Sequence, residues 1–387
     1  MSRLMPISLL LLVACGDNMK NPELPDGGPP VDAAPDPVRA VVVTPSAMFQ
    51  AGQPGVLSVV DVAAATVRPG VLSAGVIGSD PVIRKFGDEL FIVNRADNNI
   101  VILNASDFSF AGQVGTGAGS NPQDVAVIDD TLYVTTFGNK GMVSVKRTGN
   151  QPPIEIDLSK DDPDDKPNCN SVYRVGNQLY VSCELLDDTQ QFLPPRGNGV
   201  VYVVDPLPRT IAQTVNLTTK NPFNLLTQLP EHAPNAGDLV IGTIDFATGD
   251  GCLERIAVGA TASSGGCMKT NAEMGGFAAR VDVFAPEFTG PVAPIVVPPT
   301  MWMVVSDSTT FTSSVKTWNM MTGEVSASLS MSGEAPLDVA VCPDGKVVVT
   351  DAPFGGTGGV RIHDGGQRSA LLPVGLNPAS TAGLVCY

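Results

Sequence analysis

Cysteine and histidine are the residues of this chain whose types and spacing bear most directly on chemistry. The sequence contains seven cysteines and two histidines, His232 and His363. The cysteines show neither the C-x-x-C spacing of zinc sites nor the C-x-x-C-H motif of haem attachment. Neither histidine has a nucleophile or carboxylate partner nearby in sequence, and G-x-S-x-G, H-E-x-x-H and phosphate-loop motifs are absent. We therefore assign no catalytic residue and predict no metal site.

One cysteine stands at the end of a short apolar run. Residues Ile7–Ala14 include four consecutive leucines, Leu9–Leu12. The run is too short for a membrane span, which needs roughly 20 apolar residues, and it fits the apolar region of a signal peptide. The stretch Leu12-Val13-Ala14-Cys15 resembles the lipobox of bacterial lipoproteins, whose cysteine is diacylated and becomes the N-terminus. The resemblance implies a signal peptide at residues 1–14 and lipidation of Cys15. The alternative is a plain secretory signal with an incidental cysteine.

A linker follows the proposed anchor. Residues 15–37 hold the cysteine and a stretch rich in Pro, Gly and Asp, which has no aromatic residue and cannot form a core. Proline extends such a chain by about 3 Å per residue, so the linker would hold residues 38–387 away from the membrane. Gly16 after the cysteine resembles the sorting pattern that favours the outer over the inner membrane of the bacterial envelope.

Composition narrows the class of protein. The chain carries 39 acidic and 23 basic residues, a formal charge of −16, which argues against nucleic acid and against adhesion to anionic lipid. Its 40 glycines and 33 prolines, abundant valine and lack of helix-period stripes indicate an all-β protein with many turns. The acidic run Asp161–Asp165 could hold calcium, but it lacks the ligand spacing of an EF-hand, so a solvated loop is the preferred interpretation. We predict no cofactor and expect a monomer.

A repeat organises the rest of the chain. Pro122–Val127 and Pro336–Val341 share the pattern P-x-D-V-A-V, and each is followed by a turn and a second apolar run. A related segment begins at Ser79, and the period is about 40 residues where no insertion intervenes. Repeats of this length, built from short strands and turns, indicate a β-propeller more readily than a solenoid.

The segment Leu90–Thr136 resembles the YVTN-type β-propeller repeat family, which groups with NHL and quinoprotein-dehydrogenase-like propellers. Tyr133-Val134-Thr135-Thr136 stands where that family has its name motif, with Thr136 in place of asparagine. Pro336–Asp364 matches as well, whereas insertions interrupt the region from about Asn168 to Gly323. The resemblance implies an architecture of four-stranded blades, and its motif residues set strands and turns rather than a catalytic site.

Turn residues predict the number of blades. Within a blade we label the strands A to D from the centre outwards. The C–D turns are predicted near Asp61, Asn104, Arg147, Asp205, Ala285, Asn319 and Asp364. This pattern predicts seven blades. Six is the alternative, because no strand A is evident for the blade around residues 291–333. The last blade is predicted to join strand A from Asn377–Tyr387 to three N-terminal strands, which closes the ring.

Six cysteines remain after Cys15, an even number that suggests disulfides in an oxidising compartment. Cys169 and Cys183 should flank an A–B hairpin that turns at Gly176-Asn177. Cys252 and Cys267 should pair inside an insertion from about Phe246 to Gly275, which we place between strands B and C of its blade. Cys342 and Cys386 form either a third bridge or two buried thiols.

Two function classes remain. The first is a lipid-anchored scaffold that presents loops to a protein, peptide or glycan. The alternative is a propeller enzyme, lactonase-like or dehydrogenase-like, with its site at the mouth of the central channel. The scarcity of histidine favours the first class, but fold alone does not decide. The insertion Phe246–Gly275 is either a functional loop or a neutral surface insertion.

Overall fold

The computed structural model describes residues 37–46, 53–72, 75–284, 298–353, 356–379 and 381–387. Pro37–Tyr387 forms one compact unit. The predicted signal peptide 1–14, the lipidation site Cys15 and nearly all of the linker 15–37 lie outside the described residues. Within the described part of the chain, no helix is long and apolar enough to cross a membrane.

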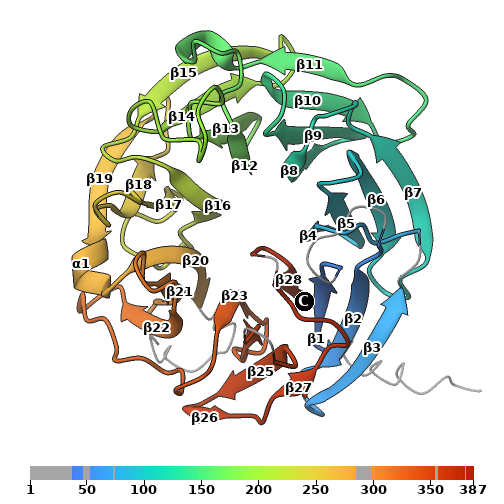
Figure 1. Cartoon of the computed structure of the whole chain (residues 1–387), viewed down its shortest axis with the longest axis vertical. Coiled ribbons are helices and arrows are strands. Elements are labelled where there is room, and N and C mark those ends of the chain that lie inside the picture. Colours follow the sequence, from blue (N-terminus) through green and yellow to red (C-terminus); the bar gives the residue numbers. More distant parts are fainter. Residues whose placement is uncertain (1–36, 47–52, 73–74, 285–297, 354–355, 380) are drawn as a thin grey trace, which may run out of the picture. The chain divides into compact units, whose positions relative to one another are not determined.

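Seven antiparallel sheets form a ring, with one edge strand of each sheet at the centre (Figure 1). We number the blades along the chain and give their strands from the centre outwards. Blades 1 to 3 contain β28 (Leu384–Cys386), β1 (Arg39–Thr44), β2 (Val56–Asp61) and β3 (Thr66–Leu72); β4 (Pro81–Phe86), β5 (Glu89–Asn94), β6 (Asn99–Asn104) and β7 (Phe110–Gly115); and β8 (Pro122–Ile128), β9 (Thr131–Thr136), β10 (Gly141–Lys146) and β11 (Ile154–Asp157).

The same order continues around the ring. Blades 4 to 7 contain β12 (Cys169–Val175), β13 (Gln178–Cys183), β14 (Val200–Asp205) and β15 (Thr210–Asn216); β16 (Pro222–Gln228), β17 (Leu239–Thr243), β18 (Cys252–Ala257) and β19 (Ser263–Thr270); β20 (Phe277–Phe284), β21 (Thr300–Ser306) and β22 (Ser313–Asn319); and β23 (Pro336–Val341), β24 (Val347–Asp351) and β25 (Gly359–Asp364), whose outer edge pairs with β26 (Gln367–Arg368) and β27 (Leu372–Pro373). The described part of the chain also contains two short helices, η2 (Ser159–Asp161) and α1 (Asn271–Met274).

The structure confirms the seven-bladed propeller, and the six-blade alternative is wrong. Blade 6 has three regular strands, and the segment 325–330 takes the place of its fourth. The Ser326 amide donates to the Thr317 carbonyl at 2.8 Å, and the Leu329 amide donates to the Val315 carbonyl at 2.8 Å. The missing strand A of this blade is β20, which the predicted C–D turn near Ala285 had assigned to the preceding blade.

The predicted insertion Phe246–Gly275 is therefore wrong as an insertion between strands B and C. It contains β18 and β19, which are strands C and D of blade 5. The predicted C–D turn near Ala285 is wrong for the same reason, because the turn of this blade lies at residues 258–262. The remaining predicted turns agree with the strand order, so the count of seven survived one misplaced turn.

Middle strands pack between neighbouring blades and are therefore buried on both faces. In β5, Leu90 to Val93 are all at most 1% exposed, and β24 is buried along its whole length. Strands buried on both faces are expected to contain continuous apolar runs. Leu90–Val93 in β5 and Val347–Val349 in β24 are such runs, whereas the buried end of β24, Thr350 and Asp351, is polar. Outer strands such as β19 are largely exposed, so they carry no comparable apolar signal.

The two ends of the folded unit meet in blade 1. β28 pairs antiparallel with β1, with Val41 opposite Val385, and Arg39 and Tyr387 exchange backbone hydrogen bonds of 2.8 and 2.9 Å. The predicted closure of the ring is confirmed. This pairing leaves no open edge at either end of the ring, since the first and last strands of the unit share one sheet.

All three predicted disulfides are present, so the alternative of two buried thiols at Cys342 and Cys386 is wrong. Cys169–Cys183 links β12 to β13, and Cys252–Cys267 links β18 to β19. Cys342–Cys386 joins the end of β23 in blade 7 to β28 in blade 1. The last bridge ties the C-terminal strand covalently to the neighbouring blade.

Candidate functional site in the central channel

Aspartates on the innermost strands tie neighbouring blades together. In β8, Oδ1 of Asp124 accepts the amide hydrogen of Val125 at 2.8 Å, and Oδ2 accepts that of Val172 in β12 at 3.0 Å. The Ser171 hydroxyl donates to the same Oδ2 at 3.0 Å. The same pairs of bonds, at 2.8 to 3.0 Å, are made by Asp282 in β20 to Val283 and Val341, and by Asp338 in β23 to Val339 and Leu384. The repeated Asp of the P-x-D-V-A-V pattern thus links two neighbouring blades by hydrogen bonds.

Two arginines donate hydrogen bonds to these inter-blade aspartates. Nε of Arg84, in β4, donates to Asp124 Oδ1 at 2.7 Å, and Nε of Arg280, in β20, donates to Asp338 Oδ1 at 3.0 Å. Each side chain is only 13% exposed. Burial lowers the pKa of Arg84, Asp124 opposes that shift, and the positive charge of Arg280 adds to it. Burial also raises the pKa values of Asp282 and Asp338, against the nearby Arg280 charge.

Two cavities occupy the channel. The larger, of about 870 Å³, is lined by the inner strands from Arg84 and Arg280 down to the A–B turns at Gly87 and Asp129. The smaller, of about 290 Å³, lies towards the B–C loops, with Arg95, Phe137 and Glu184 in its wall. Arg84 and Leu225 line both cavities, so Arg84 marks the level at which the two meet.

Glu184 is the titratable group of the smaller cavity. Burial raises its pKa to about 7, while a hydrogen bond of 2.7 Å from Nδ2 of Asn170 to Oε1 opposes the rise. A carboxyl group that titrates near neutral pH, in a cavity with Arg84 and Arg95, has the acid–base properties of a catalytic or ligand-sensing group. Glu184 was not predictable from the sequence, because it follows a buried strand and belongs to no motif.

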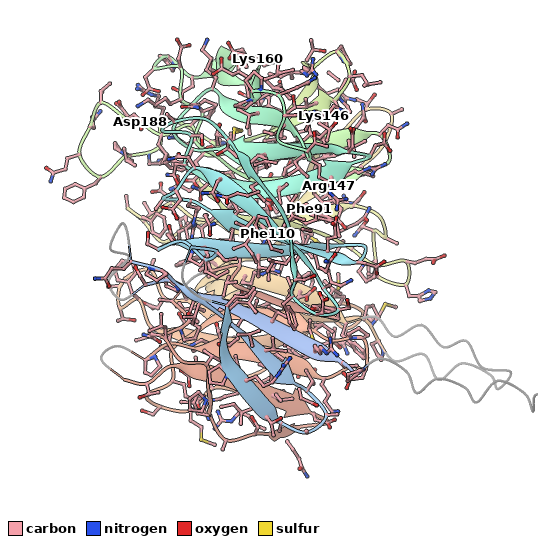
Figure 2. All side chains as sticks on the ribbon, turned by 90° about the vertical axis from the view of Figure 1, so that its right-hand side faces the viewer. Phe91, Phe110, Lys146, Arg147, Lys160 and Asp188 are labelled. Atoms are coloured by element: carbon pink, nitrogen blue, oxygen red, sulfur yellow. A yellow bond between two sulfur atoms is a disulfide. The ribbon has the colours of Figure 1, made fainter. Side chains whose placement is uncertain are left out.

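Phenylalanines stand on the B–C loops of four consecutive blades. Phe137, Phe192, Phe246 and Phe311 lie in the loops after β9, β13, β17 and β21. Phe192 is 89% exposed, Phe311 73% and Phe246 46%. The B–C loops emerge on one side of the disc, because strands alternate in direction within every blade. Figure 2 shows the two sides: Asp188, in the B–C loop of blade 4, lies opposite Arg147, in a C–D turn.

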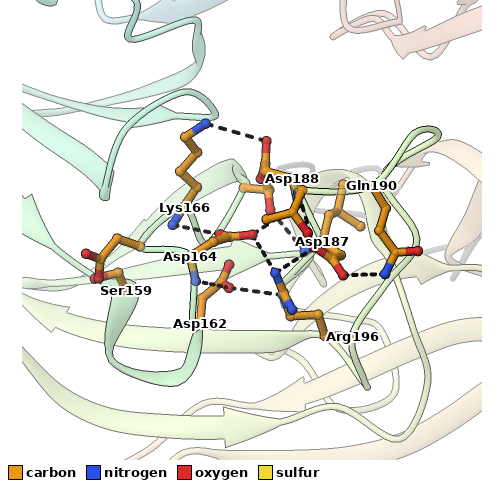
Figure 3. A network of polar contacts seen from close by, with 12 residues as sticks. Ser159, Asp162, Asp164, Lys166, Asp187, Asp188, Gln190 and Arg196 are labelled. Atoms are coloured by element: carbon orange, nitrogen blue, oxygen red, sulfur yellow. Dashed lines mark hydrogen bonds and ion pairs between the residues drawn. The ribbon is translucent and has the colours of Figure 1, made fainter.

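A network of charges fixes the stem of the blade 4 loop (Figure 3). Nη2 of Arg196 lies 2.6 Å from Asp164 Oδ2 and 2.7 Å from Asp187 Oδ1, and its Nε lies 3.5 Å from Asp162 Oδ1. Burial raises the pKa of Asp162 to about 6, and Arg196 opposes this. The Asp188 amide donates to Asp164 at 3.0 Å, which joins the loop to the segment before β12.

This network includes part of the acidic run Asp161–Asp165 that the sequence analysis considered for calcium. The guanidinium group of Arg196 lies beside the carboxylates of Asp162 and Asp164, so it supplies the positive charge that a bound metal ion would otherwise provide. Among the residues that the structure describes, no group of three or more His, Cys, Asp or Glu side chains is arranged to hold a metal ion.

The histidines lie apart from both channel cavities. His232 is exposed in the A–B loop of blade 5, between β16 and β17. His363 lies in β25, with its ring centroid 5.5 Å from that of Trp302. Burial, together with the nearby Arg368 charge, lowers the pKa of His363 to about 4, so it is neutral at physiological pH. The structure does not bring the two histidines together.

The fold and its channel define this protein as a seven-bladed β-propeller, and comparison with solved structures agrees. The chain is similar to a putative 6-phosphogluconolactonase from Bacteroides uniformis ATCC 8492, with a TM-score of 0.57 and 13% identity over 91% of this chain and 100% of that chain. It is also similar to Kuenenia stuttgartiensis hydrazine synthase, with a TM-score of 0.53 and 16% identity over 77% of this chain and 88% of that chain. Citrobacter koseri AztD gives a TM-score of 0.52 and 12% identity over 91% and 98%.

Identities this low show a shared fold and nothing finer. No family model matches the chain, and no curated protein matches its sequence. The similarity to YVTN-type repeats therefore stays a resemblance of repeat sequences.

Proposed function

We propose that this protein is a lipid-anchored binding protein of the bacterial cell envelope, which takes a polypeptide partner on its B–C loop face. The observation that carries the proposal is the exposure of Phe192, Phe246 and Phe311 on the same side of three consecutive blades. Exposed aromatic side chains are typical of the energetic centres of protein interfaces. Phenylalanine has no hydrogen-bonding group, so these side chains suit the apolar surface of a polypeptide better than a glycan.

The phenylalanines are displayed on supported loops. Phe246 packs edge-to-face on Phe223 and Phe277, with ring centroids 6.2 and 5.7 Å apart. The Arg196 network holds both ends of the loop that carries Phe192. A loop that is already ordered loses less conformational entropy on binding, so this support favours a recognition role.

The lipid anchor completes the proposal. Lipidation at Cys15 and the extended linker 15–37 would present the propeller at a membrane surface, with the outer membrane favoured by Gly16. A net charge of −16 would keep the body of the protein from lying on anionic lipid and would leave the loop face available.

The test places a photocrosslinking amino acid at Phe192, Phe311 or Phe110 in cells. Phe110 is the matched control, since it is 60% exposed but lies at the start of β7, away from the B–C loops. We expect the same polypeptide adduct from positions 192 and 311 and none from 110. With that partner purified, the double variant Phe192→Ser, Phe311→Ser should bind at least tenfold more weakly, and Phe110→Ser should bind as the wild type does.

The proposal fails if positions 192 and 311 give no common adduct or if position 110 gives the same one. An adduct removed by glycosidases rather than proteases would identify a glycan partner and overturn the choice of a polypeptide.

One observation favours a second candidate, a propeller enzyme working at the channel mouth. Glu184, with a pKa of about 7, shares the smaller cavity with Arg84 and Arg95. That set would supply an acid–base group and positive charge to a small polar substrate. Hydrolysis of lactones that is lost in Glu184→Gln would favour this candidate over polypeptide binding.

A further inference from the structure

We propose that the central channel holds a small oxyanion, a carboxylate or phosphate group, between Arg84 and Arg280. This site is independent of the B–C loop face, because it lies among the innermost strands rather than on the loops. Three features of the channel favour an anion here: a buried guanidinium nitrogen of Arg84 without an acceptor, carboxylates whose oxygens already accept backbone hydrogen bonds, and two arginines that line one cavity.

Both guanidinium groups are held by two of their three nitrogens. Nη1 of Arg84 donates to the Ile83 carbonyl at 2.6 Å, and Nη1 of Arg280 donates to the Val281 carbonyl at 3.0 Å. Nε of each arginine donates to an aspartate, so Nη2 is the third nitrogen whose partner remains to be identified. Nη2 of Arg84 is buried and has no hydrogen-bond partner, and no described residue accepts from Nη2 of Arg280. A buried charged donor without an acceptor is costly, so an acceptor from outside the chain would stabilise it.

The carboxylates beside the arginines do not offer that acceptor. Both oxygens of Asp124 and of Asp338 already accept backbone amide hydrogens from their own blade and from the next one. Their negative charge is directed into the junctions between blades. Asp282, which lines the same cavity, likewise accepts the amide hydrogens of Val283 and Val341 on its two oxygens. Backbone amides therefore already engage all three carboxylates, whereas the arginines retain a donor.

The two arginines come from opposite sides of the ring. Figure 1 shows β4 and β20 across the central opening from each other. Both side chains line the same cavity, and the positive charge of Arg280 contributes to lowering the pKa of Arg84. An anion between two such groups would relieve their repulsion and accept hydrogen bonds from both, as guanidinium groups do with carboxylates and phosphates.

The cavity has room and an entrance for such a ligand. Its volume of about 870 Å³ is in the range of small-molecule sites. The cavity extends along the inner strands to the A–B turns, whose residues line its end. The occupant is therefore a small molecule that carries an anionic group, and the apolar wall at Leu225, Leu226 and Val341 would contact the remainder of the molecule.

The experiment measures binding of inorganic phosphate and of succinate to the purified propeller by isothermal titration calorimetry in a chloride buffer. The test variant is Arg280→Lys, which keeps the charge and a contact to Asp338 but loses the planar second donor. The matched control is Arg174→Lys. Arg174 also lines the larger cavity, but its Nε and Nη1 donate only to the backbone carbonyls of Gly176 and Val127.

We expect saturable binding of at least one probe to the wild type, at least tenfold weaker binding to Arg280→Lys, and unchanged binding to Arg174→Lys. Binding of phosphate alone identifies a phosphate group, and binding of succinate alone identifies a carboxylate. No saturable binding of either probe up to 10 mM would overturn the proposal. Equal binding by wild type and Arg280→Lys, with the melting temperature of the variant unchanged, would overturn it as well.

Discussion

At the scale of single residues, carboxylates in the channel wall differ by the number of donors that surround them. Asp124 accepts hydrogen bonds from two backbone amides, from the Ser171 hydroxyl and from Nε of Arg84. Glu184 accepts one hydrogen bond, from Asn170. Burial without matching donors favours the neutral form of an acid, which explains why the pKa of Glu184 rises to about 7.

Glu184→Gln should change the pH dependence of stability. The pKa of Glu184 rises from its ordinary value of 4.5 to about 7 in the folded state. Between these values the folded state binds more protons than the unfolded state. The contribution of Glu184 to the stability of the folded state is therefore fully present below pH 4.5 and is lost as the pH rises to about 7. Glutamine stays neutral and still accepts from Asn170. We expect the free energy of unfolding of the variant to exceed that of the wild type by about 1–2 kcal/mol at pH 8, and to differ little at pH 4.5.

Urea unfolding at pH 4.5, 6 and 8 measures this difference. Glu324→Gln serves as the control, because Glu324 lies in the turn after β22, outside both channel cavities. A constant difference between Glu184→Gln and wild type across this pH range would contradict the raised pKa.

At the scale of strands, the sequence predicts a strand best where both of its faces are buried. β5, β9 and β24 each contain an uninterrupted apolar stretch, Leu90–Val93, Leu132–Val134 and Val347–Val349, and were predictable, since both faces pack on neighbouring blades. β18 was missed because Glu254 interrupts its apolar pattern. Glu254 is fully buried and accepts from Thr218 and Ser264, contacts that sequence periodicity does not reveal. β19 was missed because it is an exposed outer strand containing Ser263-Ser264-Gly265-Gly266, which is typical of a loop.

Removal of the C-terminal strand should be far more damaging than an ordinary tail truncation. β28 pairs with β1, Leu384 donates to Asp338 at 3.0 Å, and Cys386 is bonded to Cys342. Deleting residues 378–387 removes all of these contacts and opens the ring. We expect the melting temperature to fall by more than about 10 °C, or the protein to become insoluble.

The double variant Cys342→Ala, Cys386→Ala separates the bridge from the strand. The bridge spans 44 residues, and the chain-entropy model gives it about 4 kcal/mol. This variant should therefore melt at a temperature between those of the truncated and full-length proteins. Differential scanning calorimetry of the three proteins makes the comparison. A truncated protein that melts within a few degrees of full length would refute the closure of the ring by β28.

At the scale of the whole molecule, the ring explains why the architecture was predictable and the channel was not. Blade number follows from local turns and repeats, each contained within about 40 residues. The channel depends on which inner-strand side chains meet across the ring. Arg84 and Arg280 are far apart in sequence. Each is the fourth residue of a strand A, but the residues around them share no sequence motif that marks this equivalence. Their placement follows from ring closure, so their proximity emerges only with the complete fold.

The proposed position of the whole molecule in the cell depends on one residue, and Cys15→Ser tests that proposal. The motivating observation is Leu12-Val13-Ala14-Cys15 at the end of the apolar run. A diacylated cysteine carries more than one chain, which gives stable membrane anchoring, whereas serine cannot be acylated through a thioether. We expect Cys15→Ser to move the protein from the membrane fraction to the soluble periplasmic fraction, with loss of radiolabelled fatty acid. Asn18→Ser alters the same segment without removing the thiol and should stay with the membrane. A Cys15→Ser protein that still sediments with membranes after a salt wash would show that the anchor is elsewhere.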